Sequence, residues 1–117
     1  MIYNDDSITS VVPVEIDQDH HPFRAKTIDK NGSLIPFFDF NGQKISSNRQ
    51  DLSKCVFLCH NFWTLNCRKS ILSNAPGQAP WTFLGNNIKP IEVVGCFDVH
   101  DINDIEKTEA WIKQNLK

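Results

Sequence analysis

The sequence predicts a single α/β domain, and three stretches of the chain carry that prediction. Residues 7–17 alternate between apolar and polar side chains with the period of a β-strand. Residues 23–38 contain two short strand-like runs around an Asn-Gly pair, which predicts a β-hairpin. Residues 101–116 place apolar side chains at helical spacing behind an acidic start, which predicts a C-terminal helix. Strands combined with a helix in one short chain indicate an α/β architecture.

The first strand is expected over residues 7–17, because Ile8, Val12 and Val14 fall on alternate positions. Pro13 interrupts this pattern and has no N–H group for a sheet hydrogen bond. A proline inside a strand predicts an edge position or a bulge.

In the expected hairpin, the Asn-Gly pair supplies the positive φ that a tight turn needs. Pro36 places the second run at a sheet edge. Phe37, Phe38 and Phe40 would lie on its outward face. Such aromatic side chains are either covered by the rest of the domain or left to a partner.

The middle of the chain predicts four further segments. Residues 55–65 are rich in β-branched and aromatic side chains and predict a central strand buried on both faces. Residues 67–74 have room for two turns of helix. Residues 78–87 predict a loop with aromatic content, and residues 88–94 a short strand.

The C-terminal helix is the clearest element. Asp101 is its expected N-cap, with Asp104 and Glu106 in the first turn, where the helix dipole favours negative charge. The apolar stripe consists of Ile102, Ile105, Ile112 and Leu116.

Composition excludes several classes of protein. The chain of 117 residues has 12 Lys and Arg against 14 Asp and Glu, and no basic cluster, which argues against a nucleic-acid binder. No apolar run is long enough to cross a bilayer, so no membrane partner is expected. The first residues are polar and acidic and do not form a secretory signal, which predicts a cytoplasmic protein.

The four cysteines are Cys55, Cys59, Cys67 and Cys96. Without an export signal they are expected to be reduced thiols, mostly buried. A zinc site from the first three of them with His60 is the alternative. If residues 55–59 form a strand, however, its ends lie about 13 Å apart, too far to share one ion.

The segment from Asp98 to Asp101 joins the last expected strand to the helix. Carboxylates at the carboxyl end of a strand in an α/β sheet are well placed to hold Mg²⁺ against phosphate oxygens. The alternative is a helix cap with one exposed acid. The five glycines are widely spaced, so this sequence has no Gly-rich loop to cradle phosphates.

Two further pairs of residues are candidates for ligand binding. Arg49 and Gln50 lie in a polar loop, and a guanidinium can hold a carboxylate with two parallel hydrogen bonds. The alternative for Arg49 is a solvated loop charge. Trp81 and Phe83 could form an apolar wall of a sugar pocket, or could belong to the core.

Five short motifs follow one another along the chain: Asp6-Ser7-Ile8-Thr9-Ser10-Val11-Val12, His21-Pro22-Phe23, Asn48-Arg49-Gln50-Asp51-Leu52, Asn61-Phe62-Trp63 and Asp98-Val99-His100-Asp101-Ile102-Asn103-Asp104-Ile105. Taken in this order, they resemble the acylneuraminate cytidylyltransferase family, whose enzymes activate nonulosonic acids such as sialic acid as CMP-sugars. The resemblance runs across nearly the whole chain and covers the C-terminal half of that family's catalytic domain.

The resemblance implies a partial nucleotide-diphospho-sugar-transferase-like (Rossmann-like) domain with a projecting hairpin that dimerises. In the family, the sugar hydroxyl attacks the α-phosphate of CTP, pyrophosphate leaves, and Mg²⁺ steadies the phosphates. Asp98 would be a metal ligand, and Arg49, with Gln50 and Lys26, would face the carboxylate of an acidic nine-carbon sugar. The expected assembly is a homodimer or a higher oligomer.

This sequence departs from the family pattern at three places. The N-terminal Gly-rich nucleotide loop with its Arg and Lys is absent. His100 stands where the family's metal motif has its second acid, unless Asp101 or Asp104 compensates, and Ser53 stands where proline is usual. With these departures, the resemblance implies the C-terminal part of a cytidylyltransferase that is expected to be inactive by itself. The alternative is a non-catalytic dimerisation or ligand-binding module derived from the same fold.

Overall fold

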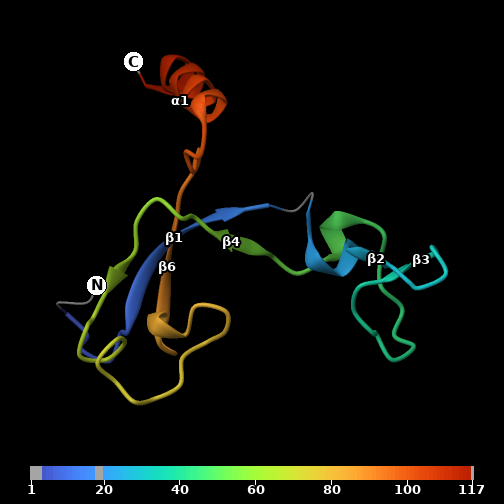
Figure 1. Cartoon of the computed structure of the whole chain (residues 1–117), viewed down its shortest axis with the longest axis horizontal. Helices are drawn as coiled ribbons and strands as arrows, with labels where there is room; N and C mark the ends of the chain where they lie inside the picture. The colour runs from blue at the N-terminus through green and yellow to red at the C-terminus, as the bar shows by residue number, and fades with distance from the viewer. Residues whose placement is uncertain (1–3, 18–19, 117) are drawn as a thin grey trace. The chain divides into compact units, whose positions relative to one another are not determined.

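The computed structural model describes residues 4–17 and 20–116 and has a mixed α/β architecture (Figure 1). Its elements are β1 (Ser10–Ile16), β2 (Lys26–Ile28), β3 (Leu34–Pro36), β4 (Val56–Leu58), β5 (Thr64–Leu65), β6 (Ile88–Glu92) and α1 (Ile102–Asn115), with short 3₁₀ helices η1 (Pro22–Arg24), η2 (Arg49–Asp51) and η3 (Thr82–Leu84). None of the described helices is long and apolar enough to cross a membrane.

The chain divides into two compact units. The larger unit consists of Met1–Glu15 and Leu58–Lys117, and the smaller one is Ile16–Phe57. The larger unit contains β1, β5, β6 and α1, and the smaller unit contains the β2–β3 pair. This division describes packing within the chain, and the single domain over residues 1–117 stays a prediction.

Strand β1 is the centre of the main sheet. Along one edge it pairs in parallel with β6, with Ser10 opposite Ile88 and Val14 opposite Glu92. Its other edge is shared by β5, which runs antiparallel, and by β4. Figure 1 shows β1 in blue beside β6 in orange. Paired on both edges, β1 buries five consecutive residues from its first position onward.

Of the two alternatives predicted for Pro13, an edge position or a bulge, the edge position is wrong, because β1 is paired on both edges. The Pro13 carbonyl accepts a hydrogen bond from the Cys59 N–H at 2.8 Å. Because the N and O of one residue point to the same edge of a strand, the missing N–H of Pro13 faces β4 and not β6. The edge beside Pro13 is covered by two short segments and not by one continuous ladder, so one missing donor is tolerated there.

The prediction of one buried strand over residues 55–65 is also wrong. This stretch contains two separate strands, β4 and β5, and Val56 and Phe57 in β4 are exposed. Between these strands the chain leaves the ladder, and the Trp63 indole N–H donates to the Cys59 carbonyl at 2.7 Å. The Cys59 carbonyl thus accepts its hydrogen bond from the Trp63 side chain and not from the backbone N–H of a neighbouring strand.

Residues 67–74 form turns and not the predicted helix. The Ser70 N–H and hydroxyl both donate to the Asn66 carbonyl, and the Ser73 hydroxyl oxygen accepts from the Ala75 N–H. Serine side chains that bond nearby backbone groups compete with helix formation, which explains the difference.

The predicted hairpin is present as β2 and β3, with Lys26 opposite Pro36 and Ile28 opposite Leu34. Its turn has a three-residue loop, in which the Gly32 N–H donates to the Asp29 carbonyl and Gly32 has φ of +79°. A type I turn followed by one left-handed glycine is a common hairpin connection. Of the Asn-Gly pair, only the glycine has a positive φ.

The prediction for α1 is confirmed, including its cap. The Asp101 carboxylate accepts from the backbone N–H groups of Asn103 and Asp104, and the Asp104 carboxylate accepts from the Asp101 N–H. The helix is attached to the rest of its unit through Trp111. A Cβ on Gly95 would collide with the Trp111 ring, and Phe97 contacts the same ring.

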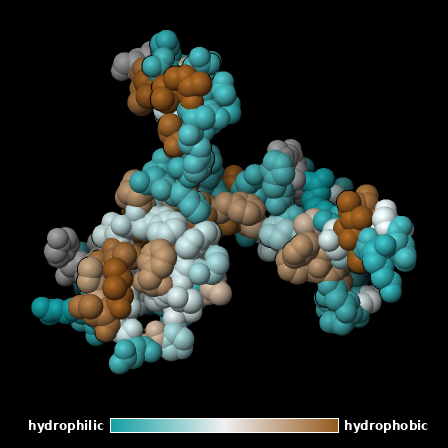
Figure 2. Space-filling view, in the orientation of Figure 1, coloured by the Kyte–Doolittle hydropathy of each residue, from teal (hydrophilic) through white to brown (hydrophobic). Residues whose placement is uncertain are grey.

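The core of the larger unit is small. Val12, Val14 and Leu84 form its buried centre. The chain exposes 9187 Å², whereas a compact monomer of its mass exposes about 6,500 Å², and two separately compact units of these lengths about 7,800 Å². Figure 2 shows hydrophobic side chains at the surface of α1 and of the β2–β3 hairpin. Much apolar surface is therefore left uncovered.

Candidate functional site

The residues predicted to bind ligands fall in both units. Lys26, Arg49 and Gln50 lie in the smaller unit, and the aromatic pair and the acidic residues in the larger one.

In the larger unit, four ring side chains form a contiguous group that we call the aromatic cluster: His60, Trp63, Trp81 and Phe83. The Trp63 ring centroid lies 5.6 Å from that of Trp81 and 5.7 Å from that of Phe83. The His60 ring lies 5.3 Å from Trp63 and 5.2 Å from Trp81. Three of these four contacts are edge-on or strongly tilted, which suits the ring quadrupoles.

Short local structure positions the cluster. Helix η3 turns Leu84 into the core, where it is 1% exposed, and leaves Phe83 on the surface at 41%. Trp63 and Trp81 pack against the buried core with part of each ring and keep another part open to solvent. Trp81 and Phe83 each contact Trp63, and the two alternatives for them, an apolar wall of a sugar pocket and part of the core, both stay open.

Sequence reasoning missed His60 and Trp63 as members of this group. Both stand in the stretch predicted as one continuous buried strand, whose alternation would direct residues 60 and 63 to opposite faces. The break between β4 and β5 turns both toward Trp81. The density of aromatic residues around position 63 was the only signal available.

A shallow hollow lies beside the cluster. Its volume is about 250 Å³. The hollow in the larger unit is lined by the Phe83 ring together with hydroxyl-bearing side chains, among them Ser73 and Thr82. An aromatic face next to hydroxyl groups suits a ligand that is apolar on one side and polar on the other.

The acidic residues before α1 are engaged with their own neighbours. Asp98 Oδ2 lies 3.0 Å from His100 Nε2, and the Asp101 carboxylate serves as the helix cap. The hydrogen bond from the His100 backbone N–H lowers the pKa of Asp104, with smaller lowering contributions from the Asp101 N–H and Lys107, while burial acts in the opposite direction.

These carboxylates do not form a magnesium site by themselves. No group of three or more His, Cys, Asp or Glu side chains within residues 4–17 and 20–116 is arranged to hold a metal ion. The arrangement around Asp101 is that of a helix cap, and the donor set does not fit Mg²⁺ without further ligands. The assignments of Asp98 and Asp101 as metal ligands stay predictions.

In the smaller unit, the predicted Arg-Gln pair stands in η2. Its loop is fixed by the Ser46 hydroxyl, which donates to Asp51 Oδ2 at 2.6 Å and accepts from the Asn48 N–H. The Gln50 side chain is exposed, and the Arg49 side chain lies outside what the structure describes. The local turn is therefore ordered by its own polar groups.

Lys26 is exposed at the start of β2 and lines a hollow of about 430 Å³. Arg24, Gln43 and Ser47 contribute to the same hollow. This places an ammonium, an amide and a hydroxyl at one opening, a set of groups that can bind a carboxylate.

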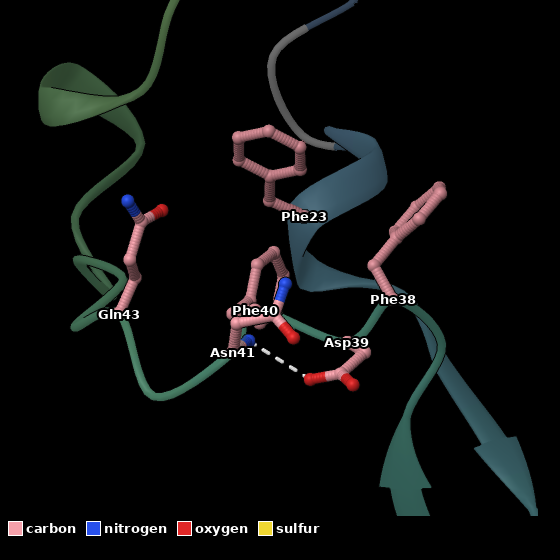
Figure 3. A pocket seen from close by; sticks show the side chains of 6 residues that line it. All are labelled: Phe23, Phe38, Asp39, Phe40, Asn41 and Gln43. Carbon is pink, nitrogen blue, oxygen red and sulfur yellow. Dashed lines mark hydrogen bonds between the residues drawn. The ribbon is translucent and has the colours of Figure 1, made fainter.

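A second hollow of the smaller unit is apolar (Figure 3). Phe23, Phe38 and Phe40 line it with Asn41 and Gln43, and the Asn41 N–H donates to Asp39 Oδ1 at 2.8 Å. The Phe23 ring contacts Phe40 at 5.4 Å and Phe38 at 6.3 Å. The exposure of Phe37 and Phe38 agrees with the outward aromatic face expected from the sequence.

Comparison with known proteins adds no assignment. No protein-family model matches the chain, and no curated protein sequence matches it.

Proposed function

We propose that this chain is the sugar-binding, C-terminal part of a cytidylyltransferase that transfers CMP from CTP to a nonulosonic acid of the sialic type and releases pyrophosphate. It would have the fold of a partial nucleotide-diphospho-sugar-transferase-like domain. The motif order supports this proposal. Because this sequence has no Gly-rich nucleotide loop, the chain is expected not to bind CTP by itself.

The aromatic cluster is the observation that carries the proposal. Trp81 and Phe83, the residues predicted as a wall of a sugar pocket, both contact Trp63 in the larger unit, where Phe83 is exposed and the two tryptophans are half-buried. The C–H groups of a pyranose ring and its acyl methyl group pack well on aromatic faces, and the adjacent hydroxyl side chains can bond sugar hydroxyls. The cluster therefore has the mixed chemistry that an acylated sugar requires.

The resemblance to the family implies a cationic partner for the sugar's carboxylate. By the motif Arg49 is its first candidate, and Lys26, which lines a polar hollow within the smaller unit, is the second. These two assignments rest on the motif and on the smaller unit alone. Positioning by these groups, together with Mg²⁺ expected in the complete enzyme, would orient the sugar hydroxyl toward CTP.

The experiment is a tryptophan-fluorescence titration of the chain with sialic acid and with CMP-sialic acid. Trp81→Ala should weaken binding about tenfold or more, as expected for loss of an aromatic contact. Trp111→Ala is the matched control, because Trp111 contacts Gly95 and Phe97 and is no part of the cluster. Arg49→Ala should weaken binding of the acidic sugar, and unchanged affinity in Trp81→Ala and Arg49→Ala would refute the proposal.

The second candidate function is a dimerisation module without catalysis. The hairpin favours it, because Ile28 and Leu34 face each other across the hairpin and are 69% and 71% exposed. Exposed apolar pairs of this kind are typical of surfaces that another molecule covers. Sedimentation equilibrium should show an oligomer that Ile28→Ser with Leu34→Ser dissociates and Arg49→Ala leaves intact, whereas a monomeric parent chain would exclude this function.

A further inference from the structure

Two of the four cysteines lie together beside the core of the larger unit. The Cys59 N–H donates to the Pro13 carbonyl, and the Val93 N–H donates to the Val14 carbonyl at 2.9 Å. Neighbouring carbonyls of a strand point to opposite edges, so the chain reaches Cys59 from one edge of β1 and Cys96 from the other. Segments distant in sequence thus meet over one face of β1.

Asn61 holds the two segments in register. The Cys96 thiol lies 2.7 Å from Asn61 Oδ1, and the Asn61 Nδ2 group donates to the Phe97 carbonyl at 2.7 Å. Because Asn61 follows Cys59 by two residues, its contact with Cys96 places the two cysteines close together, and Cys96 contributes to the raised pKa of the Cys59 thiol. Both are free thiols in this structure.

The two thiols differ in accessibility. Cys59 is 4% exposed, whereas Cys96 is partly open to solvent. Burial, followed by the contact with Cys96 and the nearby charge of Glu15, raises the pKa of the Cys59 thiol from 9.0 to about 12. Cys59 therefore stays protonated at neutral pH, and attack on a reagent from solution begins at Cys96.

We propose that Cys59 and Cys96 form a dithiol site that a small-molecule disulfide converts to an intramolecular disulfide. The Cys96 thiolate attacks one sulfur of the reagent RSSR, which breaks its S–S bond and releases RS⁻. Cys59 then loses its proton to solvent and attacks the sulfur of Cys96, forming the Cys59–Cys96 bond and releasing the second thiolate. The protein loses two hydrogen atoms, and the reagent is reduced to two thiols.

The consequence is a covalent link across β1. It closes a loop of about 38 residues and constrains the unfolded chain, so the oxidised protein is expected to melt roughly 10 °C or more above the reduced one. Because the Cys59 carbonyl accepts from the Trp63 indole, the link also fixes the strand end that supports the aromatic cluster. The proposal does not depend on what that cluster binds.

The test uses the full chain with Cys55→Ser and Cys67→Ser, incubated with oxidised glutathione and followed by mass spectrometry of intact protein and peptides. The expected product is a chain lacking two hydrogen atoms with peptides of residues 59 and 96 joined, restored by dithiothreitol. The variant that also carries Cys59→Ser should instead keep glutathione on Cys96. The variant that also carries Cys96→Ser should remain largely unmodified.

The parent chain provides a check that does not rely on the serine variants folding. In native buffer its first disulfide should be Cys59–Cys96, whereas in strong denaturant the pairs should be mixed and favour cysteines close in sequence. A lasting glutathione adduct on Cys96 with Cys59 present, or the same mixture of pairs in both conditions, would overturn the proposal.

Discussion

The sheet around β1 and the β2–β3 hairpin are both built from short strands, yet they differ sharply in burial. Strand β1 buries five of its seven residues, whereas none of the hairpin's six strand residues is buried. Partners on both edges and a covering helix η3 enclose the side chains of β1. The hairpin has one partner per strand and obtains its order from its turn and from aromatic contacts around Phe23.

This difference indicates where the chain's stability lies. Two-stranded hairpins are marginal in water unless a third element covers one face. The larger unit can be stabilised by its own core, small as it is, while the apolar face of the hairpin needs a covering surface. Substitutions in the two regions should therefore have very different effects on the free energy of unfolding.

The largest expected effect is at Leu84. Replacing it with alanine removes a side chain that is 1% exposed and should lower the free energy of unfolding by about 2–5 kcal/mol. The matched substitution Leu34→Ala, in the hairpin, removes a side chain that is 71% exposed and should cost less than about 0.5 kcal/mol in the isolated chain. Urea denaturation measures both, and equal losses would contradict the comparison.

The second effect comes from two Gly→Ala substitutions, one of which adds only backbone strain while the other adds strain and a steric clash. Gly95 and Gly42 have φ of +75° and +77°, so alanine is strained at both by about 1 kcal/mol. A Cβ at Gly42 meets open space, but at Gly95 it meets the Trp111 ring. Gly95→Ala should therefore lower the melting temperature further than Gly42→Ala and should shift the Trp111 emission.

If both glycine variants melted at the same temperature and left the emission unchanged, the attachment of α1 through Trp111 would be refuted. This pair of variants also isolates the only described ring contacts between α1 and the preceding segment, those of Trp111.

The parts predicted correctly are those governed by local chemistry. The α1 cap follows from Asp101 and Asp104 alone, and the hairpin follows from a turn that Asp29 and Gly32 close within five residues. The parts predicted wrongly depend on distant partners. Nothing near Pro13 reveals that both edges of its strand are occupied.

The candidate site shows the same division. Trp81 and Phe83 are separated by one residue, so a loop that exposes one readily exposes the other. Their contact with Trp63 depends on the break between β4 and β5, where one continuous strand was predicted. The hydrogen bond from the Trp63 indole N–H to the Cys59 carbonyl, which stabilises this break, cannot be inferred from the sequence.

A smaller effect is expected from His21 in the smaller unit. Its Nδ1 accepts from the Phe23 N–H, so Nε2 carries the proton and donates to the Ser53 carbonyl at 3.1 Å. His21 is 5% exposed, and its ring joins the start of the smaller unit to its end. His21→Ala should cost about 1–3 kcal/mol and increase hydrogen exchange in residues 22–57.

His20→Ala is the control for that measurement, because His20 is exposed and bonds only to Asp17 among the contacts of its ring. If both histidine variants raised hydrogen exchange equally, the proposed role of the buried His21 ring in joining the two ends of the smaller unit would be refuted.

The smallest effect concerns the first turn of α1 and is a dependence on pH. The pKa of Asp104 is lowered in the folded chain, first by the His100 N–H, so its carboxylate stabilises the helix above the ordinary value of 3.8 and ceases to do so as pH falls through the lowered value. Circular dichroism should show helix loss in that acid range, and Asp104→Asn should already have a reduced helix signal at neutral pH. Glu106→Gln should retain the acid transition, because the capping box belongs to Asp101 and Asp104.

Since α1 lies outside the small core, the loss of helix in acid should leave the urea midpoint of the β1 sheet nearly unchanged. This measurement separates the stability of α1 from that of the sheet.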